Sequence, residues 1–338
     1  MPCAPRMAAT FGGRSSTPTA NTPLMAQQGA TVPRLRVFDA ALRSLLQGVK
    51  LSPNAQIWRF QTDDANRKLV LEYRSDTLQR DIILVDRDRN SVQLFAHDDG
   101  ILGHVTARTR PVSFPARDGL PLKGYLTVPQ GVPEKSLPLV VLVHGGPRMD
   151  EPWLPDLVTL RLASRGYAVL RVAYRGTVGR GRRLIETAFG EWGGKMQTDV
   201  TDTACWAVRQ GIGDSHRLAV MGGSYGGHAA MEALVQTPKL FAAAVSIAGP
   251  ADLVSLVDDL TTWRQSDRDH SDLYMGTDPA LRRDRSPIHH VDRIERPLPA
   301  YQGDKDEIVH PDQLPRMNRP CTPPANTARP TTMITGME

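Results

Sequence analysis

The sequence contains little that would support a disulfide framework, a metal centre or a membrane span. Its three cysteines, Cys3, Cys205 and Cys321, lie far apart without metal-ligand spacing, so we expect neither a disulfide scaffold nor a bound metal or cofactor. Cys205 lies in a helical pattern and is predicted as a small core residue. The apolar run at residues 139–143 is far shorter than the roughly 20 residues that cross a bilayer.

Charge and the N-terminal composition also exclude several classes of partner. The net charge is +5, but the basic residues are scattered, so we predict no nucleic-acid or membrane surface. Residues 1–34 contain no apolar segment of the secretory type, and we therefore expect a cytoplasmic protein. This segment is rich in Ala, Thr, Ser, Pro and Gly, which predicts a disordered tail.

Residues 35–110 are predicted as a small β-meander. A helical pattern at residues 37–46 precedes alternating runs at residues 56–60, 68–73, 81–85 and 91–95, which turn-forming residues separate. A sheet of about four strands has the size of a single propeller blade. Its exposed edges predict that it covers another domain rather than standing alone.

Residues 111–318 are predicted as an α/β domain with a mostly parallel sheet. A hairpin with an Asp-Gly turn at residues 111–128 opens it, and strands then alternate with helices. The predicted strands are residues 139–143, 168–172, 218–221, 242–247 and 298–302, and the predicted helices are residues 157–164 and 198–210.

A glycine-rich turn follows the strand at residues 218–221. The sequence Gly222-Gly-Ser-Tyr-Gly-Gly227 fits the Gly-x-Ser-x-Gly nucleophile elbow, a strained strand-to-helix turn that exposes its serine. Gly222 and Gly226 lack a Cβ, so strand and helix can approach closely around Ser224. The backbone N–H of Tyr225, at the helix N-terminus, is then directed at a developing oxyanion.

A second oxyanion donor is predicted in the loop after the strand at residues 139–143. His144-Gly-Gly-Pro147 begins there, and such a loop supplies the other donor in this fold. We assign the donor to the N–H of Gly146, with Gly145 as the near alternative. His144 directly precedes these glycines and is predicted to brace the loop.

The acid is expected after a later strand, because hydrolases of this fold run Ser, Asp, His along the chain. Gly303 ends the strand at residues 298–302 and leaves Asp304, Asp306 and Glu307 on the next loop. Residues 176–181 are also rich in glycine, but their spacing does not fit a dinucleotide or phosphate-binding fingerprint.

Taken together, these motifs resemble the catalytic domain of the prolyl oligopeptidase family, nearest to its acylaminoacyl-peptidase and dipeptidyl-peptidase branch. The resemblance also includes Tyr174-Arg-Gly176, Ser286-Pro-Ile288 and Gly303-x-x-Asp306-x-x-Val309, and it covers residues 111–318 in order. It implies a serine peptidase of α/β-hydrolase fold with a peptide substrate, preceded by a β-propeller. Ser224 is then the nucleophile, Asp306 the acid with Asp304 second, and Gly146 and Tyr225 the oxyanion donors.

Two departures from the family accompany the resemblance. Residues 35–110 provide about one propeller blade, so we interpret them as a partial remnant that caps the catalytic domain. The family's histidine, expected some way after the acid, is absent: no histidine follows His310. The other candidates do not lie at the position of the family's histidine: His289, His290 and His310.

The functional expectation is therefore a serine peptidase that cleaves peptide or acyl-peptide bonds but is impaired here. Without a base the hydroxyl is a poor nucleophile, and removing the histidine of another serine protease lowers turnover roughly a millionfold. The alternatives are a catalytically inert relative that only binds peptides and a carboxylesterase on the same fold.

Residues 319–338 do not predict the helix and strand that would close the domain, because they are rich in proline and threonine. We interpret them as an aberrant, out-of-frame tail. Reading the last base of each codon with the first two of the next permits Tyr-Asp-Tyr-Gly-His-Gly near the end, in which the Asp and the final Gly are forced by Met333, Ile334, Met337 and Glu338.

This interpretation predicts a single-base shift in the DNA shortly after the codon for Asn318. Sequencing across the 3′ end of the gene is expected to restore a family-like histidine loop. A confirmed present frame would contradict it.

Overall fold

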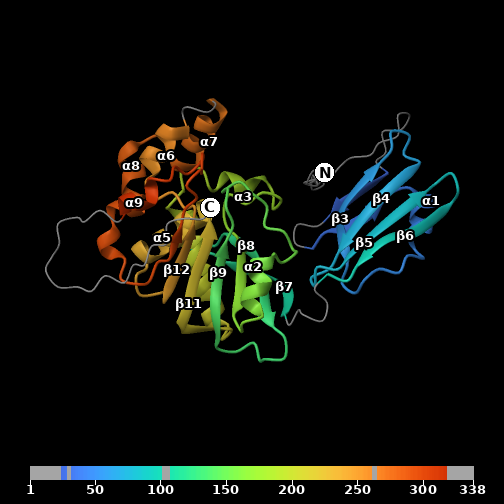
Figure 1. Cartoon of the computed structure of the whole chain (residues 1–338), viewed down its shortest axis with the longest axis horizontal. Helices are drawn as coiled ribbons and strands as arrows, with labels where there is room; N and C mark the ends of the chain where they lie inside the picture. Colours follow the sequence, from blue (N-terminus) through green and yellow to red (C-terminus); the bar gives the residue numbers. More distant parts are fainter. Residues whose placement is uncertain (1–23, 29–31, 101–106, 261–264, 318–338) are drawn as a thin grey trace, which may run out of the picture. The chain divides into compact units, whose positions relative to one another are not determined.

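The structure is a computed structural model, and it describes residues 24–28, 32–100, 107–260 and 265–317. The chain divides into two units, residues 1–111 with 152–160 and residues 112–151 with 161–338. Each unit has its own hydrophobic cluster. Figure 1 shows the helices and strands of both units, coloured along the sequence. The predicted tail at residues 319–338 lies outside the described residues.

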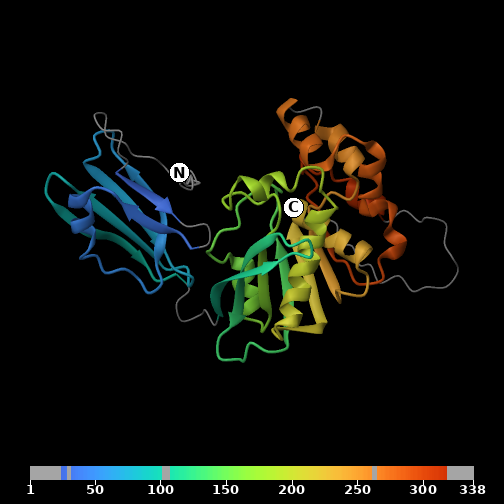
Figure 2. The same ribbon diagram turned by 180° about the vertical axis from the view of Figure 1, so that it is seen from behind.

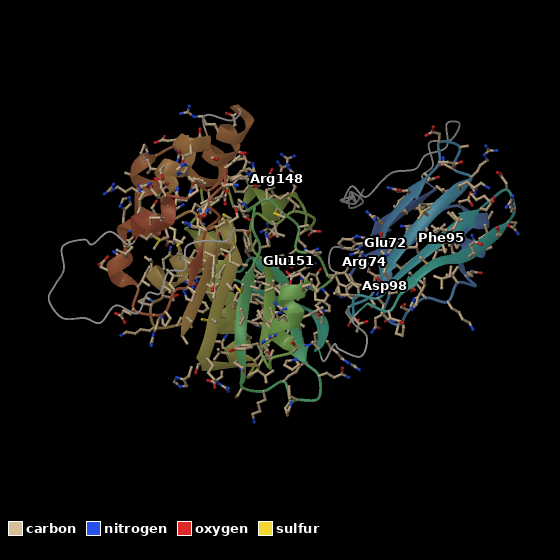
Figure 3. The ribbon with its side chains drawn as sticks, in the orientation of Figure 1. Glu72, Arg74, Phe95, Asp98, Arg148 and Glu151 are labelled. Atoms are coloured by element: carbon tan, nitrogen blue, oxygen red, sulfur yellow. The ribbon has the colours of Figure 1, made fainter. Side chains whose placement is uncertain are left out.

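The first unit contains the predicted four-stranded antiparallel meander, which is confirmed. Its strands follow each other in sequence order: β3 (Gln56–Thr62), β4 (Lys68–Arg74), β5 (Arg80–Asp86) and β6 (Ser91–Asp98). Alternate side chains bury one face, among them Leu69, Leu71 and Ile83. On the other face Glu72 forms ion pairs with Arg59 and Arg74. Figure 3 labels Glu72 and Arg74.

The N-terminal boundary needs a correction, because order begins before residue 35. Strands β1 (Met25–Gln28) and β2 (Arg34–Val37) form an antiparallel pair, and helix α1 (Ala40–Leu46) follows instead of the helix predicted from residue 37. Met25 is 1% exposed and joins Leu42 in the core of the meander. Composition alone did not predict this long-range pairing, because it describes the segment only as polar and rich in proline.

The second unit is built on a seven-stranded sheet in the order β13-β12-β11-β9-β10-β8-β7. Strands β9 to β13 are mutually parallel where they pair, and β8 is antiparallel to β10, so the predicted mostly parallel sheet is confirmed. The strands are β7 (Ala107–Pro115), β8 (Pro121–Pro129), β9 (Leu137–Val143), β10 (Ala168–Ala173), β11 (Gly213–Gly223), β12 (Ala243–Ile247) and β13 (Ala300–Tyr301).

Two helices form the layer on which the site depends. Helix α4 (Lys195–Arg209) and helix α5 (Tyr225–Gln236) pack against each other and against β9 and β11, and Figure 2 shows the unit from behind. Cys205 of α4 is half-buried, so its assignment to the core was wrong. No helix among the described residues is long and apolar enough to span a membrane.

Several short helices were not predicted from the sequence. Four of them, α6 to α9, gather together in Figure 1. Besides the predicted α2 (Leu157–Ala163), the helices are α3 (Arg182–Glu186), α6 (Leu253–Leu260), α7 (Gln265–Met275), α8 (Pro279–Asp284) and α9 (Gln313–Met317), with single 3₁₀ turns at Pro287–His289 and Val291–Arg293.

A buried carboxyl group on α5 couples this unit to pH. Glu232 is 1% exposed, and burial raises its pKa from the ordinary 4.5 to about 8, although Gln236 donates a hydrogen bond to it. The folded chain therefore binds a proton there that the unfolded chain releases above pH 4.5.

We expect this group to lower the free energy of unfolding as pH rises from about 5 to 8, because only the unfolded state loses the proton readily. Glu232→Gln places an uncharged side chain of the same size at this position. It should reduce the loss of unfolding free energy between about pH 5 and 8 by on the order of a few kcal/mol. Urea unfolding at several pH values measures it. Glu186→Gln, on an exposed helix position, is the control; an unchanged slope in Glu232→Gln would contradict the prediction.

Candidate active site

Ser224 lies in the tight turn between β11 and α5. Its backbone has φ 53° and ψ −121°, a strained conformation for a residue with a side chain. The N–H of Ser224 donates to the carbonyl of Ile247 at 2.8 Å, which fixes the turn to the end of β12. The side chain is exposed, and its hydroxyl has no hydrogen-bond partner among the described residues.

The two elbow glycines are required by close backbone contacts. A Cβ on Gly226 would lie 2.1 Å from the carbonyl oxygen of Val143, and one on Gly222 would lie 2.5 Å from the same oxygen. Helix α5 therefore begins directly against the end of β9, and the sequence argument for these glycines agrees with this geometry. Gly223 differs, because a Cβ there would meet nothing closer than 3.7 Å.

The loop after β9 reaches the elbow. A Cβ on Gly145 would lie 3.4 Å from the Cβ of Ser224, so this loop and the serine are neighbours. Gly146 is exposed and has φ 116°, a conformation that glycine adopts readily. Within the described residues, the backbone N–H groups of Gly146 and Tyr225 have no acceptor, so both can donate to a bound oxyanion.

His144 is held in a fixed position behind this loop. Its Nδ1 lies 2.7 Å from the carbonyl of Gly145 and therefore carries the proton, which leaves Nε2 to accept from the hydroxyl of Thr177 at 2.8 Å. The hydroxyl of Tyr174 donates to the carbonyl of His144 at 2.9 Å. Burial lowers the pKa of His144 to about 4, so the ring is neutral and braces the loop.

Aromatic rings form the floor beneath the elbow. Tyr174 stacks on His144 and on Tyr225, with ring centroids 4.3 and 5.0 Å apart. Trp192 meets Tyr225 edge-on at 4.7 Å. The side chain of Tyr225 is fully buried, so this packing fixes the backbone N–H that follows Ser224.

Asp306 is the ordered carboxylate of the loop after β13. Its Oδ1 accepts from the N–H groups of Ile308 and Val309, at 2.9 and 3.0 Å, and its Oδ2 accepts from the buried amide of Gln302 at 3.0 Å. Asp304 is exposed and has no hydrogen bond from its side chain to the described residues. The geometry thus favours Asp306 over Asp304 as a fixed acceptor.

The three loops begin at the same edge of the sheet. Gly223 of β11 pairs with Ile247 of β12, which pairs with Tyr301 of β13, and Gly222 pairs with Val143 of β9. Because these strands are parallel, the loops bearing Gly146, Ser224 and Asp306 all leave from their carboxyl ends.

The described histidines other than His144 offer no base with the required contacts. His228 is buried below the elbow and lies 2.9 Å from the carbonyl of Pro250 through Nδ1. His290 contacts the carbonyl of Asp284, and His310 contacts Asp312, so neither is bonded to Asp306. Among the described residues, no group of three side chains could hold a metal ion.

Sequence reasoning missed the residues that support the site. Gln302, Thr177 and the hydroxyl of Tyr174 hold Asp306 and His144. Tyr174 begins a motif of the family resemblance, but no supporting role was predicted for it, and Gln302 and Thr177 belong to none of the quoted motifs. Gln302 directly precedes Gly303 at the end of β13, and that position was the available signal.

This fold, with an exposed elbow serine and free backbone donors, is that of an α/β-hydrolase. The sequence model of the prolyl oligopeptidase family matches residues 155–334, and the chain belongs to this family of serine-type peptidases.

Known relatives agree with that assignment. The chain is 33% identical over 288 residues to dipeptidyl aminopeptidase BIII of Pseudoxanthomonas mexicana, which covers 81% of this chain and 42% of the relative. It is 29% identical over 179 residues to the acylamino-acid-releasing enzyme of Arabidopsis thaliana, over 51% of this chain and 23% of the relative. The chain thus spans less than half the length of these relatives.

A solved structure is similar over most of the chain. A puromycin-hydrolysing peptidase of Mycobacterium tuberculosis matches with a TM-score of 0.76 and 28% identity, over 92% of this chain and 48% of that one. The fold prediction, an α/β-hydrolase with a small antiparallel sheet before it, is therefore confirmed.

The glycine contacts predict different tolerance to substitution at two elbow positions, Gly226 and Gly223. Gly226→Ala should destabilise the chain by about 3 kcal/mol or more, because the new methyl group would overlap the backbone of β9. Gly223→Ala should change stability by less than about 1 kcal/mol, since its Cβ would have ordinary contacts. Thermal unfolding of both variants measures the difference. Equal effects would contradict the close contact between the start of α5 and the end of β9.

Proposed function

We propose that this chain carries the catalytic machinery of a serine peptidase that cleaves peptide or acyl-peptide bonds. With its proton taken by a base, Ser224 would attack the carbonyl carbon, and an acyl-enzyme would form as the C–N bond breaks and the amine leaves with that proton. The N–H groups of Gly146 and Tyr225 would stabilise the oxyanion, and Asp306 is the carboxylate that would orient such a base.

The observation that carries this proposal is the exposed, strained Ser224 beside the Gly145–Gly146 backbone. Its hydroxyl is not used to cap α5, and the N–H groups of Gly146, in the neighbouring loop, and of Tyr225, directly after Ser224, have no acceptor among the described residues. A serine in this setting stabilises the fold poorly but is well placed for attack on a bound carbonyl.

The proposed substrate class rests on the relatives. Their names are those of a dipeptidyl aminopeptidase, an acylamino-acid-releasing enzyme and a puromycin-hydrolysing peptidase. We therefore infer short peptides or N-acylated peptides as substrates. The meander would be a partial propeller remnant, and no metal or cofactor enters the proposed reaction.

The base limits the activity expected of this polypeptide. The sequence holds no histidine after His310, and His228, His290 and His310 have other contacts. Turnover without a base should be lower by roughly a millionfold, although oxyanion donors can leave about 10³–10⁴ over water. A second candidate is an inert relative that binds peptides without cleaving them, and a carboxylesterase on the same scaffold is the third.

A fluorophosphonate probe tests the nucleophile. Prolonged incubation should label the wild-type chain slowly and leave Ser224→Ala unlabelled, because only the elbow serine is adjacent to oxyanion donors. Ser215→Ala, at an exposed serine of β11, should label like wild type. Intact-mass measurement reads the adduct.

The outcome separates the candidate functions. A folded wild-type chain that never labels, yet binds an acylated peptide in calorimetry, would support the inert relative. If labelling occurs, faster cleavage of an acylated peptide than of a simple ester supports a peptidase, and the reverse order supports a carboxylesterase.

A further inference from the structure

The glycine-rich segment at residues 174–181 runs alongside the oxyanion loop, residues 144–151. The sequence of this segment fits no ligand-binding fingerprint, but in the structure the segment contacts the oxyanion loop. We propose that this segment is a template that sets the oxyanion loop, with Thr177 and Arg180 as its positioning residues. The proposal rests on the proposed function, because it concerns how the Gly146 donor is placed.

Contacts between the two segments proceed in the same order along both. At the start, Thr177 and Tyr174 hold His144, as described above. Further on, the N–H of Val178 donates to the carbonyl of Met149 at 3.0 Å. At the end, Nη2 of Arg180 donates to the carbonyl of Glu151 at 2.6 Å. Gly145 and Gly146 lie between the first and second of these attachments, so the template fixes the loop on both sides of the proposed donor.

Arg180 is itself fixed by a buried cluster. Its side chain is 8% exposed, and the same Nη2 donates to the hydroxyl of Tyr125 at 2.9 Å. The guanidinium groups of Arg180 and Arg171 both approach the ring of Tyr125, and Arg171 forms a buried ion pair with Glu151 at 2.8 Å. The carbonyl and the carboxylate of Glu151 are thus both bound by arginines anchored on the sheet side of the loop.

The loop differs sharply between its two labelled residues in Figure 3. Arg148 is exposed to solvent, whereas Glu151 is 3% exposed. The stretch around Arg148 has few attachments of its own, so its position depends on the fixed ends. The positive charge of Arg180 also helps burial to keep the pKa of His144 low, which preserves the neutral ring that bonds Thr177.

The test compares Arg180→Met and Thr177→Val with Arg182→Met. Arg182 is exposed on α3 and pairs with Glu186, so its loss leaves the template intact. With fluorophosphonate, the maximal labelling rate constant should fall roughly tenfold or more in both template variants, while the probe concentration giving half the maximal rate stays unchanged. Arg180→Lys keeps one donor and should recover part of the rate.

Hydrogen exchange provides a readout that does not need a reactive serine. A peptide covering residues 174–181, in which the N–H of Val178 donates to the carbonyl of Met149, should exchange at least tenfold faster in Arg180→Met and Thr177→Val than in wild type, whereas a peptide from β4 should not change. A wild-type chain that never labels would refute the proposed function alone, and exchange would still decide this proposal.

Two results would overturn the template. One is wild-type exchange of residues 174–181 in both variants. The other is a labelling defect in which the probe concentration giving half the maximal rate rises while the maximal labelling rate constant stays unchanged. If Arg180→Met fails to fold, Thr177→Val and Arg180→Lys carry the same comparison.

Discussion

The second unit, which carries Ser224, depends on how closely the start of helix α5 can approach the end of strand β9. The missing side chains of Gly222 and Gly226 allow α5 to begin within van der Waals contact of the end of β9. That approach puts Ser224 beside the glycines that follow β9. Without it, the serine, the Tyr225 amide and the Gly146 amide would belong to separate loops, and none of the surrounding hydrogen bonds could combine them into one site.

Support for this arrangement comes from groups that are themselves buried and paired. Arg175 binds Asp199 of α4 and Asp118 of the β7–β8 turn, and the ring of Tyr174 next to it stacks under the elbow. Buried ion pairs of this kind contribute modest net stability but are costly to break, so they fix geometry more than they strengthen the fold. The acid loop is anchored in the same way by the amides of Gln302 and Gln313.

Much of the fold could be predicted from local patterns, because parallel strands buried on both faces are continuous apolar runs. The turn at Ser224 and the loop with Gly146 could be expected from such runs, since glycines follow each strand, whereas Asp306 was chosen over Asp304 by chain order and the family resemblance; the catalytic roles of all three stay predictions. The pairing of β1 with β2 and the helices α6 to α9 were not, because they depend on long-range packing of weakly patterned segments. The roles of Gln302 and Arg180 were also hidden, since a polar side chain reveals its partner only in three dimensions.

Ser224 occupies the N-cap position of α5, where a serine hydroxyl ordinarily bonds the first amides of a helix. Here it makes no such bond. The helix therefore forgoes roughly 1 kcal/mol of capping and tolerates a backbone strain of about 1–3 kcal/mol. Glycine has no Cβ and would relax this backbone conformation, so the fold gains no stability from the side chain of Ser224, which agrees with the chemical role proposed for its hydroxyl.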